Sequence, residues 1–146
     1  MEVVDVNITD LKPSEYNPRQ MTEKQAGDLR KSIEEFDMVE PIVVNKHAGR
    51  ENIIVGGHQR FFICKEMGRK TMPVVYVDLD EAREKELNLR LNRNLGEWNW
   101  DLLANFNEEL LKQVGFDEEL ERLFPKENEK PEETFRNECP KCGYKW

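Results

Sequence analysis

The residues best suited to hold an anion surround two adjacent glycines, Gly56 and Gly57. The β-branched run Ile53–Val55 before them favours a buried strand, and a short helical pattern follows and ends at Gly68. A helix start leaves backbone N–H groups without acceptors, and glycine lets a ligand approach closely, so this junction can hold a phosphate. Arg60, in the first helical turn, would add a forked and permanently charged donor. The junction alone also fits an ordinary tight turn. The surrounding sequence must therefore distinguish a phosphate site from such a turn.

The surrounding elements predict a domain that mixes strands and helices. Strands are predicted within residues 3–11, 42–44, 53–55 and 73–77, and helices within 22–36, 58–67, 80–96, 101–114 and 118–124. Up to the helix at 101–114 the order is β-α-β-β-α-β-α-α, which predicts an α+β fold with a small mixed sheet packed with helices. The loop between the first strand and the first helix contains two prolines and carries Arg19.

Apolar spacing predicts which face of each helix is buried. Thr22 and Gln25 have the spacing of a capping box, and four apolar residues follow on one helical face: Ala26, Leu29, Ile33 and Phe36. The face expected for the helix that starts at Asp80 and ends at Gly96 consists of Ala82, Leu87, Leu91 and Leu95. The face expected for the helix that starts at Asp101 consists of Leu102, Leu103, Phe106, Leu110 and Leu111.

Composition excludes several classes of protein. The 146 residues carry a net charge of −8 and no apolar run near the ~20 residues of a membrane span. The first residues lack a signal peptide, and three cysteines make no disulfide scaffold, so we expect a cytoplasmic protein with no membrane partner. The acidic balance disfavours a domain that holds duplex DNA by phosphate neutralisation alone. DNA contact is therefore expected through a local basic patch or a partner.

Three regions are predicted along the chain. Residues 1–124 form the folded domain with a C-terminal helical extension, residues 125–138 have the composition of an acidic flexible linker, and residues 139–146 resemble half of a zinc ribbon. Cys139 and Cys142 have the spacing of a zinc knuckle, whereas a closed Zn²⁺ site needs four ligands. Three interpretations stay open: a ribbon cut off at Trp146, a Cys₄ site shared by a homodimer, or an unused remnant.

Three local sequences, in this order, resemble the N-terminal domain of the ParB family, within the wider ParB/sulfiredoxin superfamily. They are Asn17-Pro18-Arg19, then Ser32-Ile33-x-x-Phe36 running into Glu40-Pro41-Ile42-Val43-Val44, and then Ile54-Val55-Gly56-Gly57-His58-Gln59-Arg60. In the third of these sequences the family typically has Gly-Glu-Arg-Arg, where this chain has Gly57-His58-Gln59-Arg60. The resemblance covers roughly residues 3–100.

The resemblance implies a nucleotide site. In ParB proteins the glycine turn and its arginines hold the phosphates of a nucleoside triphosphate, usually CTP, and the loop arginine closes over them. This maps onto Gly56, Gly57 and Arg60, with Arg19 opposite. His58 and Gln59 occupy the same phosphate-binding turn but stand where the family has Glu and Arg, so one charged contact is missing.

The residues that bind Mg²⁺ in the family are less well matched in this chain. A Glu-Asn pair binds nucleotide and Mg²⁺ in the family, and this chain has Arg93-Asn94 in the corresponding context. Asn94 matches, whereas Arg93 cannot coordinate a cation. Glu97 is the candidate Mg²⁺ ligand from one turn later. The cofactor prediction is CTP or ATP with Mg²⁺, and Zn²⁺ at the knuckle.

Other branches of the superfamily suggest alternative functions. Sulfiredoxin-like proteins carry a nucleophilic cysteine where this chain has His58, and a serine-kinase branch has Gly-His-His-Arg, in which His58 would be a general base or a phosphate donor. Residues 91–100 resemble ParB-like domains of phages and mobile elements, which are often found beside DNA modification methyltransferases; this chain has no methyltransferase motif itself.

The first hypothesis is a nucleotide-binding accessory domain in DNA transactions, such as phage DNA modification or partition, which meets DNA directly or through a methyltransferase. The alternatives are a nucleoside triphosphatase, a ParB-like nuclease, a small-molecule phosphotransferase, and a protein-interaction domain that has lost its ligand.

Overall fold

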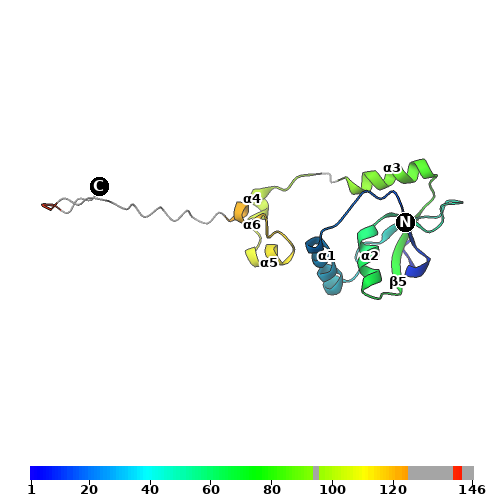
Figure 1. Ribbon diagram of the computed structural model, residues 1–146, viewed down its shortest axis with the longest axis horizontal. Helices are drawn as coiled ribbons and strands as arrows, with labels where there is room; N and C mark the ends of the chain where they lie inside the picture. The colour runs from blue at the N-terminus through cyan, green and yellow to red at the C-terminus, as the bar shows by residue number, and fades with distance from the viewer. Residues whose placement is uncertain (94–95, 125–139, 143–146) are drawn as a thin grey trace. The chain divides into compact units, whose positions relative to one another are not determined.

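The computed structural model describes residues 1–93, 96–124 and 140–142, which belong to two compact units, Met1–Glu97 and Trp98–Trp146 (Figure 1). Each unit is described by itself below. No helix in the described ranges is long and apolar enough to span a membrane.

The first unit is built on a five-stranded mixed sheet. Its elements are β1 (Val4–Asn7), the 3₁₀ turn η1 (Ile8–Asp10), β2 (Lys12–Pro13), α1 (Glu23–Phe36), β3 (Ile42–Asn45), β4 (Ile53–Gly56), α2 (His58–Glu66), β5 (Thr71–Val77) and α3 (Glu81–Asn92). The strand order is β1-β5-β3-β4-β2, with β1·β5 and β3·β4 antiparallel and β3·β5 and β2·β4 parallel. The predicted α+β class is confirmed, and β3 and β4 form a hairpin.

β2 was not predicted, because its two residues fall in the proline-containing stretch assigned to a loop. It forms the sheet edge next to β4, with Lys12 opposite Ile53 and Pro13 opposite Ile54. An edge strand tolerates a proline, since one side of it has no ladder to complete. The pairing also fixes where the following loop, which carries Arg19, leaves the sheet.

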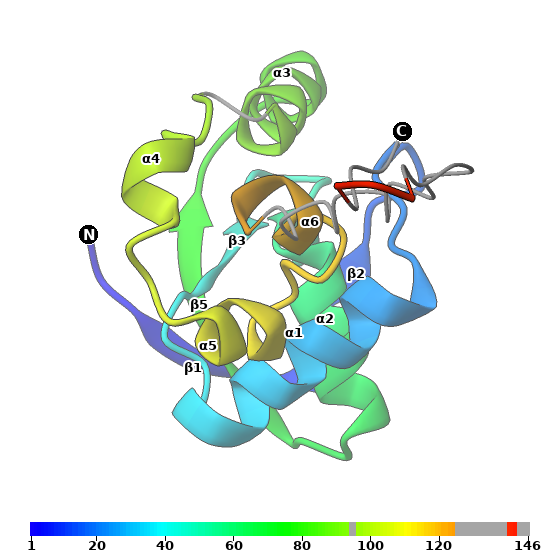
Figure 2. The same cartoon turned by 90° about the vertical axis from the view of Figure 1, so that its left-hand side faces the viewer.

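The hydrophobic core lies between the sheet and the helices α1 and α2, which lie side by side (Figures 1 and 2). Alternate strand residues point to the same face, and the buried cluster is made of Ile8, Leu11, Ile33, Ile42, Val44, Ile54, Phe61, Ile63, Cys64, Met72 and Val74. α3 packs along β4 away from these two helices (Figure 2).

α1 follows its predicted start and departs from its predicted end. The Thr22 side chain accepts from the backbone of Gln25, and the Gln25 side chain accepts from the backbone of Thr22, so the capping box is confirmed. Ile33 is buried, but Phe36 is 63% exposed, so its predicted place in the core is wrong. The helix ends at Phe36, and Asp37 follows it with a φ of 64°.

The predicted apolar face of α3 is also wrong. The helix begins after Asp80 as expected but ends at Asn92 instead of Gly96. Its fully buried residues are the polar Glu84 and Asn88, whereas Ala82 is exposed and Leu91 is 48% exposed. Polar side chains can face the sheet here because Asn88 donates to the Val55 carbonyl (2.8 Å) and Glu84 accepts hydrogen bonds from three residues.

The second unit contains α4 (Trp100–Leu103), α5 (Glu108–Gln113) and α6 (Leu120–Leu123) around Leu103, Leu111 and Leu123. The single helix predicted after Asp101 is therefore wrong. Asn107 accepts a hydrogen bond from the Leu110 backbone and so caps a separate helix. Of the residues predicted for the apolar face of the single helix, three are exposed: Leu102, Phe106 and Leu110. The predicted linker, 125–138, lies outside the described residues.

Candidate functional site

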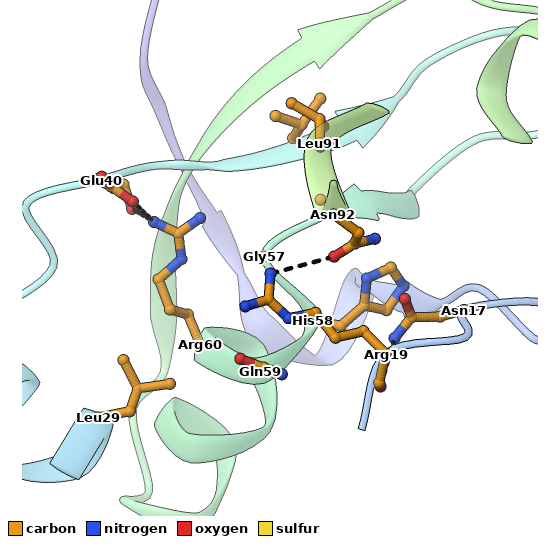
Figure 3. A pocket seen from close by; sticks show the side chains of 12 residues that line it. Asn17, Arg19, Leu29, Glu40, Gly57, His58, Gln59, Arg60, Leu91 and Asn92 are labelled. Carbon is orange, nitrogen blue, oxygen red and sulfur yellow. Dashed lines mark hydrogen bonds and ion pairs between the residues drawn. The ribbon is translucent and has the colours of Figure 1, made fainter. Parts of the chain in front are cut away.

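A cavity of about 410 Å³ opens in the first unit at the start of α2 and the end of α3, beside the loop that follows β2 (Figure 3). Its lining residues are Asn17, Arg19, Leu29, Glu40, Val43, Gly56, Gly57, His58, Gln59, Arg60, Leu91 and Asn92. It thus joins two segments more than 30 residues apart to the glycine turn. Its volume lies in the range of small-molecule sites.

The glycine turn has no room for a side chain. Gly57 is the N-cap of α2 with a φ of 92°, and a Cβ there would lie 2.6 Å from Cγ2 of Ile42. A Cβ on Gly56 would lie 2.8 Å from Cδ1 of Leu91. The first helical hydrogen bond runs from the Phe61 N–H to the Gly57 carbonyl (3.0 Å), so the preceding N–H groups have no acceptor inside the helix. These donors belong to residues that line the cavity.

Arg60 supplies the first cation of the cavity. Its side chain is 24% exposed and extends from the first turn of α2, and Nη2 comes within 3.2 Å of the Cβ position built on Gly57. Nη1 donates to the carboxylate of Glu40 and, at 3.4 Å, to the Glu40 carbonyl. The guanidinium is therefore held over the glycine turn.

Arg19 supplies the second cation from the loop after β2. Its Nη1 lies 3.5 Å from Oδ1 of Asn92, the last residue of α3 (Figure 3). Asn92 is oriented by a bond from its Nδ2 to the Asn88 carbonyl (2.8 Å). Because Arg19 is exposed and this contact is long, its guanidinium can turn toward an anion in the cavity.

His58 connects the loop to α2. The ring is 5% exposed, the Ser14 N–H donates to Nε2 (3.2 Å), and the Ser14 hydroxyl lies 2.7 Å from the same nitrogen. Burial lowers the pKa of His58 to about 4, so the ring is neutral at pH 7. Since Nε2 accepts, the proton sits on Nδ1, and Nδ1–H is the group left to meet a ligand. This arrangement suits a phosphate donor, whereas action as a general base through Nε2 requires loss of the Ser14 contact.

The pKa of His58 predicts how stability depends on pH. An unfolded histidine takes up a proton near pH 6.5, and the folded ring does so only near pH 4, so folding stability falls as the pH drops through this window. We expect the loss to approach about 2 kcal/mol, allowing for screening at the cavity opening. Urea unfolding of the wild type and His58→Gln at pH 7 and pH 4.5 measures it. Equal pH dependence in both proteins would contradict the prediction.

The structure brings most of the predicted site residues together. Arg19, Gly56, Gly57, His58, Gln59 and Arg60 all line the cavity. Asn94 lies outside the described residues, whereas Asn92, the last residue of α3, lines the cavity. Six further residues of the lining were not predicted to bind the nucleotide: Asn17, Leu29, Glu40, Val43, Leu91 and Asn92. The spacing of Asn92, one helical turn after Asn88, could have indicated it, but the predicted helix end at Gly96 concealed this.

The donors of the site do not match a metal held by the protein. Among the described residues Glu40 is the one carboxylate in the lining and it is paired with Arg60, whereas Leu91 presents a hydrocarbon beside the glycine turn. Glu97 is exposed and is not part of the lining. Mg²⁺ needs oxygen ligands in octahedral geometry, so these residues do not fit a protein-bound Mg²⁺. Across the described residues there is no group of three His, Cys, Asp or Glu side chains that could hold a metal. Cys142 is an exposed free thiol, and Cys139 lies outside the described residues.

A mixed sheet whose strand runs through a Gly-Gly turn into a helix, with arginines from the helix and a preceding loop, is the arrangement expected of a ParB-like domain. Residues 1–94 match the sequence model of the ParB N-terminal domain, and the chain belongs to this family.

Curated relatives agree with this assignment. The chain is 31% identical over 108 residues to the probable chromosome-partitioning protein ParB of Campylobacter jejuni, covering 73% of this chain and 38% of the relative. It is 32% identical over 91 residues to the stage 0 sporulation protein J of Bacillus subtilis, covering 62% of this chain and 32% of the relative. The chain thus spans well under half the length of either protein.

Solved structures share the fold. A C-terminally truncated ParB from Caulobacter crescentus, complexed with CTP-γ-S, matches with a TM-score of 0.62 at 24% identity, over 78% of this chain and 71% of that one. Sulfiredoxin from Arabidopsis thaliana matches with a TM-score of 0.52 at 18% identity, over 62% of this chain and 100% of that one. These likenesses confirm the predicted fold.

Proposed function

We propose that the first unit binds a nucleoside triphosphate of the CTP or ATP type by its phosphates. The observation that carries the proposal is the convergence of Arg19, Arg60 and the start of α2 on one cavity. Guanidinium forks and free helix-start amides both suit phosphate oxygens. The family agrees, since the similar ParB of C. crescentus has been solved with CTP-γ-S.

The biological setting that we propose is a DNA transaction, with partition favoured by the curated relatives. A ParB of C. crescentus similar to this chain has also been solved with the centromeric parS site. With a net charge of −8, this chain would meet DNA through a local basic patch, a second copy of the chain or a partner protein. A role in phage DNA modification beside a methyltransferase, cytoplasmic location and a shared Zn²⁺ at the C-terminal cysteines stay predictions.

Binding is better supported than catalysis. Triphosphate hydrolysis or nuclease activity would draw on a metal, and the described part of the lining offers it one carboxylate, which is already paired. Phosphotransfer through His58 would need a ring nitrogen free to accept a proton, whereas Nε2 faces Ser14. The function that we propose is therefore nucleotide binding without catalysis.

Replacing Arg60 tests the proposal. We expect Arg60→Ala to weaken binding of the preferred nucleotide by about 10- to 100-fold, because a charge-assisted hydrogen bond to phosphate contributes about 1.5–3 kcal/mol. Calorimetric titration with CTP, ATP and GTP, each with and without Mg²⁺, measures it. Arg69→Ala is the matched control: it removes an arginine that follows α2 and pairs with Asp37 outside the cavity.

The outcomes separate the hypotheses. Weakening by Arg60→Ala with no change in Arg69→Ala supports the cavity as the site. Absence of binding by the wild type to any of the three nucleotides would remove the proposal and favour an interaction domain. Equal loss in both variants would indicate a general charge effect.

A further inference from the structure

The Arg60 guanidinium is already paired with an anion that belongs to the protein. Nη1 donates to Oε2 of Glu40 and to the Glu40 carbonyl, so the side chain and backbone of one residue hold it. Glu40 lies two residues before Ile42, the first residue of β3. This strand fixes the Glu40 backbone beside the cavity. Its side chain is 76% exposed, against 24% for Arg60. The carboxylate is thus the more solvent-exposed member of the pair.

The pair stands where a phosphate is expected. Nη2 of Arg60 lies over the glycine turn, within 3.2 Å of the Cβ position on Gly57, and Glu40 lines the same cavity (Figure 3). A carboxylate and a phosphate both use the planar fork of a guanidinium, so they compete for the same donors. If Glu40 stayed in place, its charge would repel the incoming phosphate at short range.

We infer that Glu40 is an internal counter-ion that a ligand phosphate displaces from Arg60. The inference rests on the proposed function. It adds that Glu40 sets the affinity and the selectivity of the cavity for its ligand. A ligand carboxylate offers Arg60 nothing that Glu40 does not already provide. A phosphate carries more charge and more acceptor oxygens, and it also meets the helix-start amides and Arg19. The cavity therefore selects phosphate esters over carboxylate ligands.

Removing the competing charge tests this inference. We expect Glu40→Gln to bind CTP about two- to five-fold more tightly than the wild type in calorimetric titrations at low salt, the range that suits an exposed ion pair. Glu35→Gln is the matched control, because it removes the same charge from the exposed end of α1 outside the cavity lining. Its affinity is expected to equal that of the wild type.

A second measurement reports displacement directly. The ¹³C resonance of the Glu40 side-chain carboxyl in the wild type should move on saturation with CTP, toward its position in ligand-free Arg60→Ala. A carboxylate that acts only by long-range repulsion would stay paired and keep its resonance.

The results distinguish this inference from the function on which it rests. Tighter binding in Glu40→Gln alone, with the carboxyl shift, supports both. Equal or weaker binding in Glu40→Gln, with CTP bound by the wild type, overturns the inference and leaves nucleotide binding intact. Absence of binding by both proteins overturns the two together.

Discussion

Placing alanine at position 57 is expected to destabilise the first unit by about 2–5 kcal/mol and to weaken nucleotide binding sharply. Two costs add. A φ of 92° lies in a region that costs an L-residue about 1–2 kcal/mol, and overpacking a buried site typically costs about 1–3 kcal/mol. The new Cβ would lie 2.6 Å from Cγ2 and 3.0 Å from Cβ of Ile42, which is itself fully buried. Relief must therefore come from moving the turn, and with it the N–H groups that face the cavity.

Gly68→Ala is the matched control. Gly68 has a φ of 74°, follows the same helix, and has no atom of the described residues within 4 Å of its Cβ position. It should lose only the conformational part, about 1–2 kcal/mol, and keep its nucleotide affinity. Urea unfolding followed by circular dichroism, with calorimetric titration of CTP, gives both quantities. Equal losses of stability in the two variants would show that the contact with Ile42 is not what requires glycine at position 57.

The parts of the fold that sequence predicts well are those whose cause is local. The capping box of α1 depends on Thr22 and Gln25 alone, and the end of α2 depends on Gly68. The β3–β4 hairpin follows from two β-branched runs joined by a polar turn. The glycine turn was predicted for the same reason, since its positive φ and close contacts are properties of the residues in the turn.

The parts that sequence predicts poorly depend on partners far along the chain. α3 was assigned an apolar face from its leucines, but the buried positions are Glu84 and Asn88. No pattern inside the helix reveals this, because the hydrogen-bond donors to Glu84 come from other segments: the loop after β2, β3, and the turn between β3 and β4. The site shows the same limit: Asn92 reaches the cavity only because α3 ends there.

Glu84 is the least expected residue of the core. The carboxylate is 0% exposed, and its Oε1 accepts from the Tyr16 hydroxyl (2.5 Å) and from Nη2 of Arg50 (2.7 Å). Its Oε2 accepts from Nδ2 of Asn45 (2.6 Å) and from Nε of Arg50 (3.2 Å). Burial acts to raise the pKa of this carboxyl, but hydrogen bonds from Arg50, Tyr16 and Asn45 outweigh it and hold the pKa below its usual range. Glu84 is therefore charged at neutral pH, and its stabilising effect is lost only in acid, as the pH falls through this lowered pKa.

Glu84→Ala is expected to destabilise the first unit by about 3–5 kcal/mol, the typical effect of removing one partner from a buried ion pair. The loss leaves Arg50 without its counter-ion and Asn45, itself fully buried, without one acceptor. Glu84→Gln should lose less, because an amide oxygen still accepts from some of these donors. Chemical unfolding at pH 7 measures both. Glu86→Ala, on the exposed side of the same helix with an i,i+4 pair to Arg90, is the control and should change stability by under about 0.5 kcal/mol.

The consequence of Glu84→Ala should extend to the ligand site. Tyr16 lies three residues before Arg19 in the loop after β2, and its hydroxyl fixes that loop to α3 through Glu84. Since α3 also places Asn92 beside Arg19, Glu84 connects the loop that carries Arg19 to the helix that carries Asn92. We therefore expect Tyr16→Phe, which removes a single hydrogen bond and keeps the ring, to weaken nucleotide binding at a smaller cost in stability than Glu84→Ala. If Tyr16→Phe loses stability but binds the nucleotide like the wild type, the carboxylate supports the fold alone, and the loop is held in place by the Ser14–His58 contact.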